Sequence, residues 1–341
     1  MRLVLASVVA VVHGLQLGFG HQPHLGHAAY GELAVDAFFV LSGFLLAGSY
    51  LRLGSIRRYV WHRFLRIMPG FWVCLLVTAL VVAPVVARIQ GVPLASVFSG
   101  DQSALRFLIS DAMLLMRQFG VAGLPTDVPV PGVLNGALWT LFYEALCYAG
   151  IIGLGLIGGL KRRPWITLVT LGLFWVLTIL DVAGVVVVNQ ERILRFSLMF
   201  LIGSALFLYA DRIPLRGDIA VAAVALLLGA LLFLPDYRAL AGPALAYLCL
   251  WFVVVRPPRT IPESDFSYGL YVYHWPVLQV LVVLGVNDLG RVPFLIIGIT
   301  LALAAAFCSW NLIERRALRF KSATTSDPSA QLNEPVRAVR R

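Results

Sequence analysis

The sequence predicts an all-α, polytopic membrane protein, and three observations support this fold class. Of the 341 residues, 60% are apolar and only 13% are charged, whereas soluble domains average about 45–50% and about 25%. The mean hydropathy is +0.87. The apolar residues form runs close to the roughly 20 residues that a helix needs to cross about 30 Å of hydrocarbon. So few polar residues would not cover the surface of one soluble globule.

Ten apolar runs are candidate transmembrane helices. They cover residues 3–19, 33–51, 69–87, 137–159, 165–181, 194–210, 219–235, 241–255, 267–285 and 292–312. With ten spans both termini lie on one side, and most lysines and arginines outside the spans lie on that same side. The positive-inside rule therefore places both termini in the cytoplasm. This distribution also explains the net charge of +10 without a nucleic-acid partner.

We expect one transmembrane domain over residues 1–321, followed by a disordered cytoplasmic tail over residues 322–341. Residues 88–136 form a long outward loop, in which the apolar stretch 105–116 is too short to span and is expected to lie along the interface or re-enter. The four cysteines lie inside apolar runs with no CxxC spacing. Neither a disulfide framework nor a zinc site is predicted.

Four ionisable residues lie away from the ends of the candidate spans, where such groups are costly and therefore functional candidates. They are His13, Asp36, Glu144 and His274. Counting about 1.5 Å per residue from the span ends places the first three in the outer half of the membrane and His274 in the inner half. The alternative for each is a buried polar group that a neighbouring helix satisfies.

Two further features face the cytoplasm or the middle of the membrane. Arginines recur beside aromatic residues after the second span, at positions 57, 58, 63 and 66. They fit either an interfacial helix on anionic lipid or a clamp for a phosphorylated ligand, because guanidinium binds phosphate bidentately. Ser42 and Gly43 in the second span permit either close helix packing or the passage of a narrow ligand.

Three histidines follow the first span, at positions 21, 24 and 27. Histidine-rich tracts can bind metals, but proline and glycine separate these three and no acidic or cysteine ligand is adjacent. We therefore predict no metal site.

Six motifs together resemble the acyltransferase-3 family of integral membrane acyltransferases. They are Arg2-x10-His13, VDAFFVLSGFLL from residue 35, RRYVWHRFLRIMPG from residue 57, LWTLFYEALCYA from residue 138, SYGLYVYHWPVL from residue 267 and NLIERRALRF from residue 311. They follow the order of the family over nearly the whole chain.

The resemblance implies transfer of an acyl group, often acetyl, from a cytosolic donor such as acetyl-CoA to a hydroxyl. The implied acceptor is a sugar of a surface polysaccharide or lipid-linked glycan, or a small secreted metabolite. It also implies that the histidine of the Arg-x10-His motif, here His13, is essential. We expect acyl-CoA as a co-substrate, no permanently bound cofactor, and a place in the cytoplasmic membrane of a bacterium.

In this interpretation His13 removes the proton of the attacking hydroxyl, with Asp36 or Glu144 orienting its ring. An acyl-histidine relay is the mechanistic alternative. Trp139 and Tyr143 offer stacking faces to the acceptor. The expected donor-binding residues are Arg2, Ser42, Gly43, Arg57, Arg58, Arg63, Arg66 and His274.

Two other functions use the same residues. A transporter or flippase of a glycolipid or acylated metabolite would use His13, Asp36 and Glu144 as a proton relay. A haem-binding electron carrier would use His13 and His274 as axial ligands. The predicted depths oppose the second, because they place the two histidines in opposite halves of the membrane.

Overall fold

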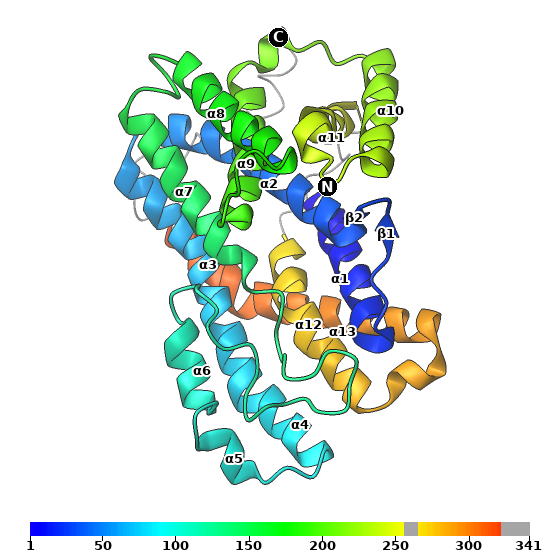
Figure 1. Cartoon of the computed structure of the whole chain (residues 1–341). Coiled ribbons are helices and arrows are strands. Elements are labelled where there is room, and N and C mark those ends of the chain that lie inside the picture. The colour runs from blue at the N-terminus through cyan, green and yellow to red at the C-terminus, as the bar shows by residue number, and fades with distance from the viewer. Residues whose placement is uncertain (256–264, 322–341) are drawn as a thin grey trace. The chain divides into compact units, whose positions relative to one another are not determined.

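The structure is a computed structural model that describes residues 1–255 and 265–321, and it is almost entirely helical (Figure 1). One short hairpin pairs β1 (His24–Leu25) with β2 (Ala28–Ala29). The helices are α1 (Arg2–Phe19), α2 (Tyr30–Leu53), α3 (Ile56–Val77), α4 (Ala83–Ile89), α5 (Leu94–Phe98), α6 (Ala104–Asp111), α7 (Thr140–Leu156), α8 (Trp165–Val182), α9 (Glu191–Leu208), α10 (Gly217–Phe233), α11 (Arg238–Val255), α12 (Ser267–Val283), α13 (Arg291–Ser309) and α14 (Arg315–Arg319). The π-helical segments η1 (Thr78–Val82) and η4 (Trp310–Glu314) join α3 to α4 and α13 to α14, and η2 (Ala210–Arg212) and η3 (Val286–Leu289) are 3₁₀ turns.

A helix occupies each of the ten predicted spans, which confirms the all-α fold class. Among the described residues, six helices or continuous helical runs are long and apolar enough to cross a membrane, namely Arg2–Phe19, Tyr30–Leu53, Ile56–Ile89, Trp165–Val182, Arg238–Val255 and Arg291–Arg319. α7 and α10 are shorter apolar helices. The protein is therefore a polytopic integral membrane protein. The number of ten spans and the cytoplasmic termini remain predictions.

Glycines end two of the predicted spans. Gly20 follows α1 with φ of 64°, and Gly54 follows α2 with φ of 59°. A residue with a side chain is strained in this left-handed conformation, and glycine is not. The amide of Gly54 donates to the carbonyl of Tyr50, which pairs one of the last carbonyls of α2.

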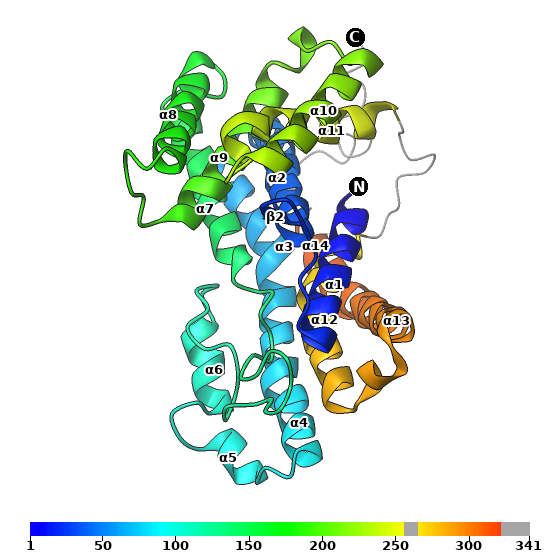
Figure 2. The same cartoon turned by 45° about the vertical axis from the view of Figure 1, so that its right-hand side comes forward.

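The described chain divides into two compact units. The first contains residues 1–23, 64–142 and 265–321, and the second contains residues 24–63 and 143–255. In the first unit, α1, α12 and α13 lie side by side (Figures 1 and 2). Leu17, Trp275, Leu278 and Phe294 form part of their shared core, and each is at most 6% exposed.

The predicted outward loop belongs to the first unit and is largely ordered by polar contacts. Gln279 of α12 donates to the carbonyls of Val130 and Val133, at 2.8 and 2.9 Å. The apolar stretch 105–116 is helical only as far as Asp111, where α6 ends. Leu105 and Ile109 on α6 are exposed, which fits the predicted interfacial position. The predicted tail, residues 322–341, lies outside the described residues.

In the second unit, α2 packs closely along α9 at small residues. A Cβ atom on Gly43 would overlap the carbonyl of Phe200, and one on Gly203 would overlap the carbonyl of Val40. The hydroxyl of Ser204 also donates to the carbonyl of Gly43 at 3.3 Å. The close contact with α9 favours the packing role of Gly43, and its predicted donor contact gains no support from the structure. The donor contact of the half-buried Ser42 remains a prediction.

Candidate active site

The structure brings two of the intramembrane ionisable residues into direct contact. The Nδ1 atom of His13 on α1 lies 2.8 Å from Nε2 of His274 on α12. The two rings are nearly coplanar, with an angle of 8° between their planes, and the ring of Trp275 meets His13 edge-on. His274 is completely buried, whereas His13 is partly accessible. Of the two, His13 is therefore the residue that a substrate can reach.

The partners of His274 determine which nitrogens carry protons. Its Nδ1 lies 3.1 Å from the carbonyl oxygen of Leu270, and a carbonyl can only accept, so this nitrogen holds the proton. In the neutral ring Nε2 then accepts from Nδ1–H of His13. Neutral His13 is left with its lone pair on Nε2. The pair therefore keeps the lone pair of neutral His13 on Nε2, the nitrogen that does not face His274.

This contact corrects the predicted depth of His274. α1 and α12 start at the same end of the first unit, since Arg2 lies 4.0 Å from Asp265, two residues before α12. At about 1.5 Å per residue, His13 is then about 17 Å from that end counted from Arg2, and His274 about 14 Å counted from Asp265. The difference of about 3 Å is small enough for the two rings to meet. The error came from measuring His13 from the outer end of its span and His274 from the inner end.

Charged residues gather where α1 and α12 begin. Arg66 of α3 pairs with Asp265, and its guanidinium also lies 4.0 Å from Glu314 of η4. Burial raises the pKa of Asp265. Arg66, then Arg2 and hydrogen bonds from Ser267, outweigh this effect and lower the pKa to about 2. Here two arginines face two carboxylates. Arg2 and Arg66 therefore have carboxylate partners within the protein. The predicted phosphate clamp took no account of these carboxylates.

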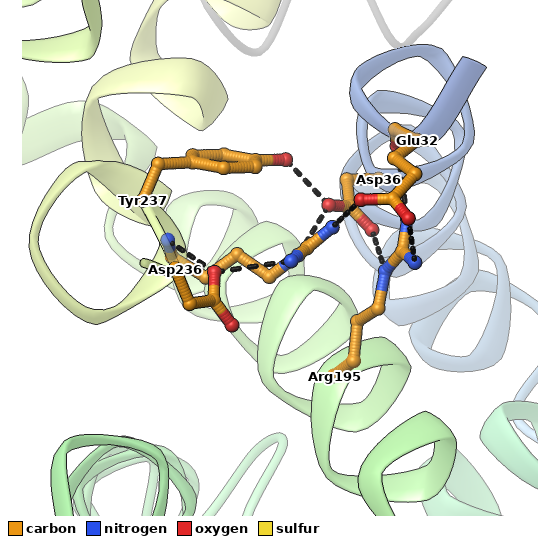
Figure 3. Close-up of polar contacts among 6 residues, drawn as sticks. Glu32, Asp36, Arg195, Asp236 and Tyr237 are labelled. Carbon is orange, nitrogen blue, oxygen red and sulfur yellow. Dashed lines mark hydrogen bonds and ion pairs between the residues drawn. The ribbon is translucent and has the colours of Figure 1, made fainter. Parts of the chain in front are cut away.

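Asp36 lies in the second unit at the centre of an ionic network (Figure 3). Its Oδ1 accepts from Nε of Arg195 at 2.8 Å, and its Oδ2 accepts from Nε of Arg238 at 2.5 Å and from the hydroxyl of Tyr237. Asp36 is completely buried, so these partners compensate its charge. The prediction that Asp36 orients His13 gains no support from these contacts, because both carboxylate oxygens are already occupied.

Glu144 also lies in the second unit, on α7. It accepts from the hydroxyl of Tyr148 at 2.6 Å. The guanidinium of Arg63 lies over the rings of Tyr59 and Tyr148, at 5.9 and 6.0 Å from their centroids. The Nε of Arg63 and the hydroxyl of Tyr59 are buried, and neither has a hydrogen-bond partner in the described part of the chain. Two buried donors are therefore available to an acceptor here.

The two predicted acceptor-binding aromatic residues occupy different units. Trp139 is half-buried in the first unit, directly before α7. Tyr143 belongs to the second unit, where its ring lies 5.3 Å from that of Phe196. Their contact with an acceptor remains a prediction. Arg57 is exposed and Arg58 half-buried at the start of α3, in the second unit.

Sequence reasoning missed Arg195, Arg238, Tyr237 and Asp265. The two arginines were counted only as loop charges. A signal was available, because each lies in the first turns of an apolar helix, where an arginine needs a partner. Among the described residues, no group of three histidine, cysteine, aspartate or glutamate side chains is placed to hold a metal. His24 lies in β1 of the hairpin.

The fold and the histidine pair together place this protein in a class. It is an all-α integral membrane protein with a candidate acid–base site between its helices. The profile of the acyltransferase-3 family, described as an acyltransferase domain, matches residues 1–311. The chain therefore belongs to the acyltransferase-3 family, as its motifs indicated. An O-acetyl transferase of Shigella phage Sf6 is 29% identical over 346 residues, which cover 97% of each chain. No solved structure matches the chain. The protein is an enzyme that transfers acyl groups, and the relative supports O-acyl transfer.

Proposed function

We propose that this protein transfers an acyl group, specifically acetyl, from cytosolic acyl-CoA to a hydroxyl of a carbohydrate or glycan-like acceptor. We place the reaction in the cytoplasmic membrane of a bacterium, with His13 as the general base. The observation that carries the proposal is the contact of Nδ1 of His13 with Nε2 of His274 at 2.8 Å. It supports a neutral His13 whose Nε2 is ready to accept a proton.

In direct transfer, Nε2 of His13 takes the proton of the acceptor hydroxyl as its oxygen attacks the thioester carbonyl. The carbon–sulfur bond breaks, and the imidazolium returns the proton to the departing thiolate. The products are an ester and free CoA. His274 accepts from Nδ1–H of His13 throughout and stabilises the positive charge that forms.

In the alternative mechanism, the relay, the acyl group is transferred first to His13 and then to the acceptor. Nε2 of His13 attacks the thioester first and the CoA thiolate leaves. The acceptor hydroxyl then attacks the acyl-imidazolium, its proton passes to the released Nε2 of His13, and the imidazolium returns it to the thiolate. Both orders use the same nitrogen. They differ in whether an acyl-His13 intermediate forms before the acceptor binds.

On the donor side, we propose that Arg57, Arg58 and Arg63 bind the phosphates of CoA. Arg63 is the best supported, because its Nε and the nearby Tyr59 hydroxyl are buried donors that lack an acceptor in the described chain. Arg2 and Arg66 face Asp265 and Glu314, so contact with phosphate would require them to exchange these carboxylates for the ligand.

The test is acyl transfer by purified protein in lipid nanodiscs, with acetyl-CoA and de-O-acetylated surface glycan from the native cells. We expect equal amounts of released CoA thiol and new ester. His13→Gln should lower turnover by at least about 10²–10⁴-fold, the contribution of acid–base catalysis. Wild-type turnover in a correctly folded His13→Gln variant would refute both the general base and the relay.

The other two functions separate in the same experiment. A transporter or flippase would release no CoA thiol. For the haem carrier, the depth argument is wrong, because the two histidines touch. The distance of 2.8 Å between their nitrogens argues against the haem carrier instead. Two nitrogens on opposite sides of one metal ion, each bound at about 2.0 Å, lie near 4 Å apart. A colourless protein that releases CoA would exclude both alternatives.

A further inference from the structure

A polar cavity of about 110 Å³ lies in the second unit, where β2 leads into α2 and where α10 connects to α11. Its polar lining consists of His27, Glu32, Asp236, Tyr237 and Arg238, and Leu231 and Leu234 contribute apolar surface. We call this cavity the α2–α11 pocket. It involves none of the residues assigned above to catalysis or to donor binding.

Four of the lining residues, Glu32, Asp236, Tyr237 and Arg238, belong to the ionic network of Asp36 (Figure 3). Arg238 donates to Asp36, to Asp236 at 3.0 Å and to Glu32 at 3.2 Å. Tyr237 donates its hydroxyl to Asp36. Arg238 is only 9% exposed, so its orientation is set by these partners. A site whose polar groups are already oriented loses little entropy when a ligand binds.

The charges around the pocket indicate which ligand it accepts. In the part of the chain that the structure describes, the three carboxylates of Glu32, Asp36 and Asp236 form ion pairs with the two guanidinium groups of Arg195 and Arg238. The surplus carboxylate disfavours an anion, so a phosphate or carboxylate ligand does not fit. A neutral polyhydroxy ligand does fit, because carboxylate oxygens accept from hydroxyl groups and guanidinium donates to their oxygens.

The size of the pocket limits how much of a ligand enters. At about 10–15 Å³ of such volume for each water molecule, 110 Å³ holds roughly seven to eleven waters. Several hydroxyl groups of one sugar ring can replace that many waters, whereas a chain of rings cannot enter as a whole. Part of the pocket wall is accessible from outside, since the side chain of Glu32 is 42% exposed.

Within the second unit, the pocket and the proposed donor clamp lie at opposite ends of α2. Glu32 is in the first turn of α2, and Arg57 follows its last residue, Leu53, by four positions. The 21 residues from Glu32 to Leu53 extend about 32 Å along the helix. The clamp is predicted on the cytoplasmic side, so the pocket is on the side where surface glycans are found.

We propose that the α2–α11 pocket binds one neutral sugar ring of the acceptor through its hydroxyl groups. This inference rests on the proposed O-acyltransferase function and names the residues that recognise the acceptor. Glu32 and Asp236 accept from sugar hydroxyls, Arg238 donates to a sugar oxygen, and Asp36 acts as a positioning residue that holds Arg238 and Tyr237.

The experiment measures KM for both substrates in nanodiscs, with acetyl-CoA as donor and de-O-acetylated surface glycan from the native cells as acceptor. Asp236→Asn removes an accepting charge, and Leu234→Trp fills the cavity without touching the ionic network. We expect each to raise the KM for the glycan at least 10-fold while the KM for acetyl-CoA changes less than 2-fold. Asp218→Asn is the control, because Asp218 pairs with Arg216 on the exposed surface of α10, and it should leave both constants unchanged.

The possible failures are distinguishable. If the wild type forms ester but Asp236→Asn and Leu234→Trp keep the wild-type KM for the glycan, the pocket does not bind the acceptor and the proposed function stands. If the wild type forms no ester with the glycan, the proposed function fails and the pocket assignment fails with it. Thermal melting of each variant excludes misfolding, and Asp236→Asn, a nearly isosteric change, decides the outcome if Leu234→Trp is unstable.

Discussion

His13 and His274 are 261 positions apart in the chain, yet their imidazole nitrogens form a 2.8 Å hydrogen bond. Because Nδ1–H of His274 donates a hydrogen bond to the carbonyl of Leu270, Nε2 of the neutral ring can only accept from His13. The buried histidine therefore determines the protonation of the accessible one. This is the task that the buried aspartate performs in a Ser-His-Asp triad, carried out here by a neutral ring.

The first prediction concerns His274 as the residue that orients His13. His274→Ala leaves Nδ1 of His13 without an acceptor, so kcat should fall by about 10–100-fold, or about 1.4–2.8 kcal/mol, with little change in the KM for acetyl-CoA. His274→Gln keeps an amide oxygen that can accept from His13 and should recover part of the loss. Steady-state kinetics with thermal melting checks this. Equal activity of the Ala and Gln variants would contradict the orienting role.

The second prediction separates the two roles considered for Asp36. Asp36→Asn leaves the guanidinium groups of Arg195 and Arg238 without their buried counter-charge, which should lower the free energy of unfolding by about 3–5 kcal/mol. Glu32→Gln, at a carboxylate that is 42% exposed, should lower it by no more than about 1 kcal/mol. Unfolding in detergent measures both. Wild-type stability with reduced kcat in Asp36→Asn would instead favour the orientation of His13.

The third prediction concerns the donor clamp. Arg63→Ala should weaken CoA binding by about 1.5–3 kcal/mol, the range for a hydrogen bond to a charged group. Arg63→Lys should recover only part of it, because lysine lacks the planar guanidinium. Titration calorimetry with CoA measures both variants. Unchanged affinity in Arg63→Ala would remove this residue from the clamp and leave Arg57 to Arg66 as an anchor on anionic lipid.

The fourth prediction concerns the charged cluster at the starts of α1 and α12. The pKa of Asp265 is lowered to about 2, against about 3.9 in an unfolded chain. Its ion pair with Arg66 therefore contributes fully above about pH 4 and is lost as the pH falls towards 2. The effect is reduced by solvent screening, since Asp265 is 37% exposed. Asp265→Asn should lower the melting temperature at pH 6 but not at pH 2. An equal loss at both pH values would show a role other than charge pairing.

The positions of the helices and the family were predictable from the sequence. Hydropathy reports local composition, and each of the ten apolar runs became a helix because a backbone in lipid must satisfy its own hydrogen bonds. The six motifs identified the family, and the resemblance singled out His13.

The partners of the functional residues were decided by the tertiary structure. Contact between His13 and His274 depends on the axial offset and rotation of α1 against α12, which local patterns do not encode. Counting from opposite span ends separated two rings that touch. For the same reason the sequence did not show that Asp36 pairs with Arg195 and Arg238, or that Gly43 contacts α9. Apolar periodicity predicts that a side chain is buried, and only the packing of one helix on another selects the residue that it meets.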